Sequence, residues 1–389
     1  MTEEMSEHVP KEQRAGWSQF IKSIATFSGD LSSLTAPSFI LSPTSLVEFP
    51  AYWGEHPESF AQVKQGRDDV ERLANVLKWF IGTLKGQYTA RNESSGSEKK
   101  PLNPILGELF LGKWADTHGF GETTLTAEQV SHHPPITAYH LENAKAGVRL
   151  DGHSAQKTSF TGRAIQVRQL GHAILRFTPD GESAEQQYLI TLPQLVIEGL
   201  LYGAPYIELQ GTSYIQSSTG YLATINYSGR GWVSGKAHSF KATISPSAAP
   251  TQAFYTIEGE WHKESRYKGK SATGAKDAVF WDADKTPRVE IQVKSVEEQE
   301  PMESRRVWAV TAAGIRKGDY DTASKDKSRI ENEQRAKRKT EAAESKPHQL
   351  RFFAHEADDP TYSALTAMFH GKPPKEDYYR YVVQVRRLY

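Results

Sequence analysis

The chain has 389 residues, of which 24% are charged and 38% are hydrophobic, a balance typical of folded globular proteins. Lysine and arginine together number 47, as do aspartate and glutamate, so no overall electrostatic field favours nucleic acid as a partner. Any anion site must therefore be a local cluster. The absence of cysteine excludes disulfides, thiolate nucleophiles and cysteine-ligated zinc sites. We expect no cofactor and no metal.

The start of the chain, residues 1–16, is polar and acidic and has no apolar core of the kind found in signal peptides. No run of about 18 apolar residues occurs elsewhere, so we expect no segment that spans a bilayer. These features predict a cytoplasmic protein whose contacts with membranes are peripheral.

The first predicted element is a short amphipathic helix that begins near Trp17. Trp17, Phe20, Ile21 and Ile24 follow the i, i+3, i+4, i+7 spacing of one helical face. Such a stripe usually belongs to a protein core. The opposite face is rich in Ser and Thr and nearly uncharged, as in helices that lie on lipid surfaces, so a movable lid is the alternative. We assign residues 1–28 to a disordered tail, up to about residue 14, followed by this helix.

Residues 68–88 have the pattern of a second amphipathic helix. The polar stretch that follows, 91–100, contains Ser and Gly and ends in two lysines, which predicts a loop. We assign residues 29–104 to an N-terminal helical segment.

From about residue 105 to 295, short runs rich in Thr, Tyr, Val, Ile and Phe recur at intervals of roughly 8 to 15 residues, separated by Gly, Pro, Asn and Ser. This pattern predicts a long antiparallel sheet. So many consecutive strands must avoid free edges, and closure into a barrel is the simplest solution. A barrel of this size is too wide to be filled by its own side chains, so we expect a cavity. The fold class predicted for 105–295 is therefore mainly β.

After Pro301 the pattern becomes helical again, and residues 326–346 are polar nearly all round. A helix of that kind is either solvated on all sides or uses its charges to bind something. We assign residues 296–389 to a C-terminal helical subdomain.

His132 and His133 are adjacent and precede two prolines, which lack a backbone N–H and so end or bend a strand. A metal site is disfavoured because adjacent strand residues point to opposite faces and no partner lies at ligand spacing. A general base is conceivable, but no nucleophile motif accompanies the pair. The simplest alternative is two strand-end histidines with local hydrogen bonds.

Two basic groups are further candidates. Lys99 and Lys100 precede a Pro-Leu-Asn-Pro turn, where a cation and exposed backbone lie together. Lys327, Glu331 and Arg335 are spaced four residues apart and form one helical stripe. Ordinary ion pairs worth about 0.2–0.5 kcal/mol each would explain that stripe. The alternative is that the carboxylate orients the two cations toward an anion.

The segment "EQVSHHPP" (128–135) closely resembles the fingerprint of the oxysterol-binding protein family. "GSEKKPLNPILGELFLGKW" (96–114) and "FILSPTSLVEFPAYWGEHPE" (39–58) resemble the same family. The resemblance runs from about residue 17 to 339 and is greatest to the short yeast-type members, which exchange sterol for phosphatidylinositol 4-phosphate. Nothing after about residue 347 can be aligned.

The resemblance implies a large, near-complete antiparallel β-barrel around a hydrophobic tunnel, with an N-terminal lid and a C-terminal helical subdomain. It also implies that one sterol or one phosphatidylinositol 4-phosphate is held at a time and exchanged between membranes without covalent chemistry. The implied partners are these lipids and the surfaces of organelle membranes such as the Golgi and the endoplasmic reticulum. We expect a monomer.

Carried over by motif, the expected headgroup site consists of Lys100, Asn103, His132, His133, Lys327, Glu331 and Arg335. The expected lid and sterol-tunnel residues are Trp17, Phe20, Trp53, Gln87, Tyr88 and Gln169. Ser154 stands where close relatives have a larger amide side chain near the tunnel floor, a departure that bears on the contact with the sterol hydroxyl.

Two rival functions remain open at this point. A sensor would bind the same lipids and sequester them with little net transport. A lipid hydrolase would use His132 or His133 as a base. Sequence does not separate the sensor from the exchanger.

Overall fold

The computed structural model describes residues 12, 14–27, 29–31, 34, 36–229, 236–269, 271, 274–346, 348–368 and 376–382. The disorder expected for the first 14 or so residues therefore concerns positions that lie almost entirely outside the described ones. None of the helices in these ranges is both long and apolar enough to cross a membrane.

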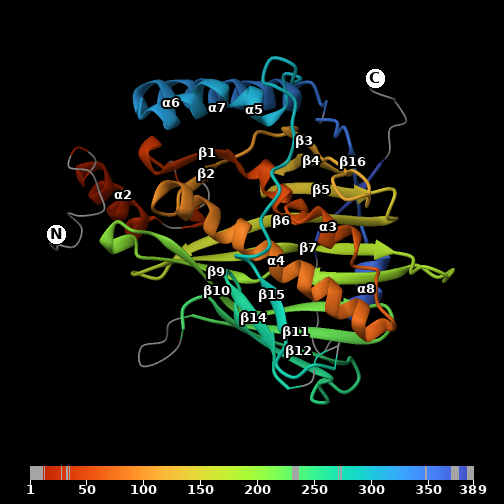
Figure 1. Ribbon diagram of the computed structural model, residues 1–389. Coiled ribbons are helices and arrows are strands. Elements are labelled where there is room, and N and C mark those ends of the chain that lie inside the picture. Colours follow the sequence, from red (N-terminus) through yellow and green to blue (C-terminus); the bar gives the residue numbers. More distant parts are fainter. Residues whose placement is uncertain are drawn as a thin grey trace.

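A 13-stranded antiparallel sheet dominates the molecule and confirms the predicted fold class (Figure 1). The strands are β3 (Leu109–Trp114), β4 (Thr123–His132), β5 (Pro135–Asn143), β6 (Val148–Phe160), β7 (Ile165–Phe177), β8 (Gln186–Thr191), β9 (Gln194–Glu198), β10 (Tyr206–Ser217), β11 (Tyr221–Ser228), β12 (Ser239–Pro246), β13 (Tyr255–Glu260), β14 (Glu264–Tyr267) and β15 (Val279–Asp282). Each strand pairs with the next along the chain, except where β7 and β10 pair with both β8 and β9.

The two edge strands, β3 and β15, are not paired with each other within the described residues, so hydrogen bonding between strands does not close the barrel. The chain after β15 covers the edge of β3 instead. Lys113 and Gln292 exchange two backbone hydrogen bonds, of 2.9 and 2.8 Å, and Leu109 N–H donates to the carbonyl of Met302. This cover satisfies edge groups that would otherwise be open to another chain.

The long helix α4 (Asp69–Ser95) crosses the inner face of the sheet, where it contacts β10, β11, β12 and β15 (Figure 1). It begins at an Asp68 cap that accepts the N–H of Glu71, a common helix start. The helix predicted for 68–88 is confirmed, but it continues into the stretch predicted to be a loop. It ends at Gly96, whose positive φ of 71° suits glycine, and the Gly96 N–H bonds to the carbonyl of Asn92.

The remaining N-terminal elements are not all helical. They are the helix α2 (Arg14–Thr26), three shorter helices η3 (Ser38–Ile40), η4 (Leu46–Gly54) and α3 (Pro57–Ala61), and two strands, β1 (Leu41–Ser45) and β2 (Lys100–Leu102), which pair in parallel. The amphipathic helix expected near Trp17 is confirmed in α2. Its buried residues Trp17 and Ile24 lie on the predicted stripe.

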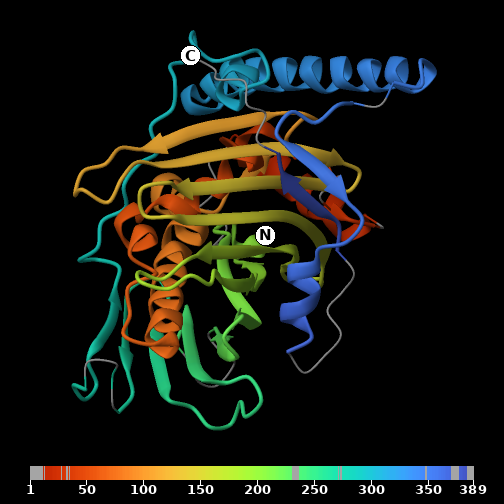
Figure 2. The same ribbon diagram turned by 90° about the vertical axis from the view of Figure 1, so that its right-hand side faces the viewer.

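Helices also form the first part of the C-terminal region: α5 (Ser304–Val307), α6 (Ala309–Lys317) and α7 (Tyr320–Ala343). The rest of that region differs from a purely helical subdomain, because β16 (Phe353–Glu356) and β17 (Tyr378–Tyr381) form a two-stranded sheet next to the short helix α8 (Pro360–Thr366). Figure 2 shows this segment against the outer face of the large sheet. There Phe353 and Tyr379 pack on Val130, Ile136 and Ala155.

Candidate functional site

An apolar cavity of about 180 Å³ lies between α2, the first half of β7 and the strands β9 and β10. Its apolar lining includes Ile165, Val167, Leu195, Ile197 and Ile207. These residues alternate along their strands, so every second side chain faces inward. A smaller chamber of about 70 Å³ lies next to the first and shares Leu46, Phe49, Gln87, Asn103, Gln156 and Gln169 with it.

The helix α2 covers the larger cavity. Trp17 and Phe20 both line it, with their ring centroids 6.3 Å apart. Trp17 is 5% exposed, and its indole Nε1–H donates to the carbonyl of Leu200 over 3.2 Å. One face of the helix is therefore turned onto the cavity in this conformation.

The other tunnel residues predicted from the sequence are distributed between the two chambers. Trp53 lines the smaller chamber, Tyr88 the larger one, and Gln87 and Gln169 line both. The Gln169 side-chain amide donates to the Tyr88 hydroxyl (2.9 Å) and to the Pro193 carbonyl (2.7 Å). These bonds fix an amide inside an otherwise apolar space, where it can orient a single polar group of a ligand. Ser154 lines the smaller chamber.

Lys100 and Asn103 lie where the cavity meets the charged helix α7. Both line the larger cavity. The Lys100 ammonium donates to the carbonyl of Leu34, in the segment that follows α2, over 2.8 Å. Burial, and then the charge of Lys327, lowers the pKa of Lys100 to about 8. Two cations held this close favour an anion between them.

On α7, Lys327 and Arg335 both lie next to Glu331. Lys327 forms a hydrogen-bonded ion pair with Glu331, and Arg335 Nη2 is 3.6 Å from the Glu331 carboxylate. The side chain of Lys327 is 12% exposed and that of Arg335 is 58% exposed. The ordinary ion-pair interpretation of this stripe is thus satisfied. An isolated surface ion pair would be exposed, so the burial of Lys327 beside Lys100 is not explained by the ion pair alone and favours an anion site.

His132 ends β4, and His133 lies in the turn before β5, with the two rings 4.8 Å apart. Burial, and then the charges of His133 and Arg338, lower the pKa of His132. Among the residues that the structure describes, its buried Nδ1 has no hydrogen-bond partner. Because the strand ends here, the two adjacent rings can approach each other instead of pointing to opposite faces of the sheet. A neutral imidazole with an unpaired nitrogen beside a cationic rim can take up a proton when an anion arrives.

Arg338 is a further candidate site residue that sequence reasoning missed. Its Nη1 donates to Nε2 of His133 over 2.6 Å, and it lies one helical turn beyond Arg335 on α7. The spacing of three residues from Arg335 was the available signal, because i and i+3 share a helix face. The structure thus brings Lys100, Lys327 and Glu331 together and brings His132, His133 and Arg338 together at the neighbouring turn.

A curved sheet around an apolar chamber, with an amphipathic helix over it and basic side chains at its rim, defines a lipid-binding domain of the tunnel type. The sequence profile of the oxysterol-binding protein family matches residues 17–381, and the chain belongs to that family. The expectation that nothing after about residue 347 can be aligned was therefore wrong, because the match continues through the C-terminal segment. Protein KES1 of Mycosarcoma maydis is 67% identical over 378 residues, which cover 97% of this chain and 98% of the relative.

Two solved structures share the fold. The ORD domain of Osh1 in complex with ergosterol superimposes with a TM-score of 0.73 at 22% identity, over 92% of this chain and 85% of the other. The ORD of Osh3 from Saccharomyces cerevisiae in complex with PI(4)P gives a TM-score of 0.66 at 21% identity, over 87% and 86%.

Proposed function

We propose that this protein binds one sterol or one phosphatidylinositol 4-phosphate molecule at a time and exchanges the two between membranes. One observation carries the proposal: Lys100 lines the same cavity as the apolar strand residues. A single site therefore offers both an apolar surface and a cation. The ligands of the related structures, ergosterol and PI(4)P, are the two kinds of molecule that such a site would accept.

At the charged end, the proposed headgroup ligands are Lys100, Asn103, His132, His133, Lys327 and Arg335, with Glu331 as the orienting carboxylate. A phosphomonoester carries a charge of about −1.5 to −2 at neutral pH. Lysine and arginine supply permanent charge, and a guanidinium can bond two phosphate oxygens at once. The imidazoles add N–H donors as they gain protons.

At the apolar end, the cavity removes the main barrier to lipid transfer. A lipid leaves a bilayer slowly because its hydrocarbon meets water, at about 0.8 kcal/mol per exposed methylene. The strand residues that line the cavity would cover this surface during transfer. Gln87 and Gln169 are the proposed contacts for the sterol hydroxyl, directly or through water.

Exchange follows from sharing one site. Because the same walls hold either body, the two lipids exclude each other, and the gradient of one can drive transport of the other. α2 would leave the cavity at a membrane and return in water, since an apolar face with few charges beside it can lie on either surface. The mechanism needs binding and release but no covalent step, so we propose that the protein is not an enzyme.

The decisive test is extraction of each lipid from liposomes. Replacing His132 and His133 together by alanine should abolish extraction of phosphatidylinositol 4-phosphate and spare extraction of sterol. His118→Ala, an exposed histidine in the loop after β3, is the control and should change neither. An equal loss of both activities in a folded double variant would refute the division of the site.

The sensor alternative predicts the same binding with little net transfer. A two-liposome assay separates the two, because an exchanger moves sterol faster when the acceptor contains phosphatidylinositol 4-phosphate. We further propose a cytoplasmic location with transient visits to organelle membranes, which imaging of the tagged protein in cells would test.

A further inference from the structure

A cluster of polar side chains lies on the outer face of the sheet, away from the cavity. His153 on β6 and His172 on β7 are directly opposite each other in the strand register. Their rings are 4.9 Å apart, and the residues are only 4% and 3% exposed. Successive side chains of a strand point to opposite faces of the sheet, and both imidazoles point to the outer face. The C-terminal segment covers them there.

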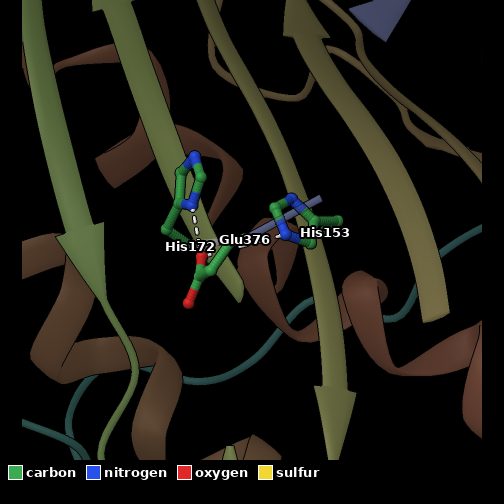
Figure 3. A group of neighbouring side chains, drawn as sticks. All are labelled: His153, His172 and Glu376. Atoms are coloured by element: carbon green, nitrogen blue, oxygen red, sulfur yellow. Dashed lines mark hydrogen bonds and ion pairs between the residues drawn. The ribbon is translucent and has the colours of Figure 1, made fainter. Parts of the chain in front are cut away.

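Glu376, just before β17, reaches both histidines (Figure 3). Its Oε2 is 2.8 Å from Nδ1 of His172 and 3.9 Å from Nε2 of His153. Its other oxygen accepts the backbone N–H of Gly171 over 3.1 Å. That bond fixes the carboxylate and leaves Oε2 pointing between the two rings.

Asp359 holds His172 from the other side. Its Oδ2 is 3.4 Å from Nε2 of His172, while its Oδ1 accepts the N–H groups of Thr361 and Tyr362 at the start of α8. A carboxylate on one ring nitrogen orients the ring toward a ligand at the other nitrogen, an arrangement that recurs around metal-binding histidines. In His172 that other nitrogen, Nδ1, is hydrogen-bonded to Glu376.

We propose that Nε2 of His153, Nδ1 of His172 and Oε2 of Glu376 bind a divalent transition-metal ion of the Zn²⁺ type, with water as the fourth ligand. The three atoms lie within 4.8 Å of one another. Donors around tetrahedral zinc, with bonds of about 2.0–2.1 Å, lie about 3.4 Å apart. To reach this geometry, His153 must move closer to the other two ligands, while Nδ1 of His172 and Oε2 of Glu376, which are 2.8 Å apart, must separate slightly. The proposal is independent of the lipid site.

The chemistry of the donors supports a cation between them. Nε2 of His153 and Oε2 of Glu376 are 3.9 Å apart, which is too far for a hydrogen bond. An ion between them would connect these two buried groups. The metal would replace the Nδ1 proton of His172, and that proton would leave to solvent. The Nε2–H group of His172 would continue to donate to Asp359.

Two imidazoles and one carboxylate select the class of metal. Imidazole suits zinc and its neighbours, whereas calcium and magnesium need more oxygen ligands. Bound metal would fasten the C-terminal segment to β6 and β7. The sequence gives no sign of this site, because the ligands come from three separate segments and only the strand register brings the histidines together.

The test uses the tag-free full chain after removal of metals. Titration with ZnSO₄ should show one saturable site per chain, and the melting temperature should rise. Co²⁺ should give the visible absorption of a tetrahedral site. His172→Gln and Glu376→Gln should each weaken Zn²⁺ binding by at least about tenfold, and Asp359→Asn, outside the ligand set, should weaken it by about 10- to 100-fold.

His355→Gln is the matched control, because His355 lies on β16 of the same segment and is exposed beside Asp377. It should bind Zn²⁺ like the wild type. If His172→Gln does not fold, as judged by circular dichroism, Glu376→Gln tests the same claim. Absence of a one-to-one site, equal competition by Mg²⁺ or Ca²⁺, or binding unchanged in a folded Glu376→Gln protein would overturn the proposal.

Discussion

Trp17 and Leu200, 183 residues apart in the chain, are joined by a hydrogen bond from the indole Nε1 to the carbonyl oxygen, 3.2 Å long. The bond links α2 to the turn between β9 and β10. Leu200 lines the cavity as well, so this contact joins the cover to the wall of the cavity.

Trp17→Phe removes that hydrogen bond and keeps an aromatic ring over the cavity. A buried hydrogen bond contributes about 1 kcal/mol, so sterol should leave the variant about fivefold faster. Release of a fluorescent sterol to excess acceptor liposomes measures the rate.

Trp114→Phe is the matched control, because its indole donates to the carbonyl of Val289 over 2.9 Å and does not line the cavity. It should release sterol at the wild-type rate. Equal acceleration in both variants would mean that general loosening, not the cover, sets the rate.

Arg338→Gln should weaken phosphatidylinositol 4-phosphate binding by about tenfold and leave sterol binding unchanged. The guanidinium contacts His133, and a bond to a charged group contributes about 1.5–3 kcal/mol. Co-sedimentation with liposomes that contain each lipid gives the comparison.

Arg329→Gln serves as its control, since Arg329 lies on the same helix but pairs with Asp326 and Glu333 at the surface. If the two variants lost the same affinity, the effect would be one of overall charge rather than of position.

Binding of phosphatidylinositol 4-phosphate should fall as the pH rises above 8, where Lys100 loses its proton. A bound phosphate raises the pKa of Lys100, so binding takes up a proton, and affinity must fall with rising pH between the free and bound pKa values. Between pH 7 and pH 9 the loss should approach about tenfold.

Lys100→Arg should bind with a much flatter pH profile, because guanidinium keeps its proton. Sterol binding should not change over this range in either protein. An unchanged slope in Lys100→Arg would assign the titration to another group.

Glu108 gives a prediction about stability. Burial raises the pKa of its carboxyl group to about 7, while Trp308 donates its indole N–H to the same group. The folded protein therefore keeps a proton that the unfolded chain releases above pH 4.5, and stability is lost as the pH rises from 4.5 to 7. The loss amounts to about 3 kcal/mol.

Glu108→Gln should remove this loss. The melting temperature of the variant minus that of the wild type should be larger at pH 8 than at pH 5. Glu333→Gln, at an exposed position on α7, should show the same difference from the wild type at both pH values. A uniform drop in stability across the pH range would show that the amide is simply a poor fit.

The sequence predicted the parts of the site that depend on short-range order. The prolines after His133 indicated where a strand ends, and the four-residue spacing of Lys327, Glu331 and Arg335 indicated one helical face. The antiparallel sheet followed from the repeated β-rich runs. The locations of these groups relative to the cavity came from resemblance to a family.

Long-range relationships were beyond the sequence. Whether β3 pairs with β15 depends on sheet curvature, and the cover by the chain near Gln292 has no local signal. The extension of α4 to Ser95 was missed because a polar helical end resembles a loop in composition, and its end is fixed by Gly96. The strands β16 and β17 are short and separated by α8, so their pairing was not visible either.

The Lys100 ammonium holds the carbonyl of Leu34, in the stretch just past α2, and has two further N–H donors. A phosphorylated ligand would attract that ammonium and weaken its hydrogen bond to Leu34, which attaches the segment after α2 to the cavity. An uncharged ligand would leave this hydrogen bond intact. The two ligands would then have different residence times for a reason unrelated to how well either fits the cavity. The charge of the headgroup would set the rate of ligand release.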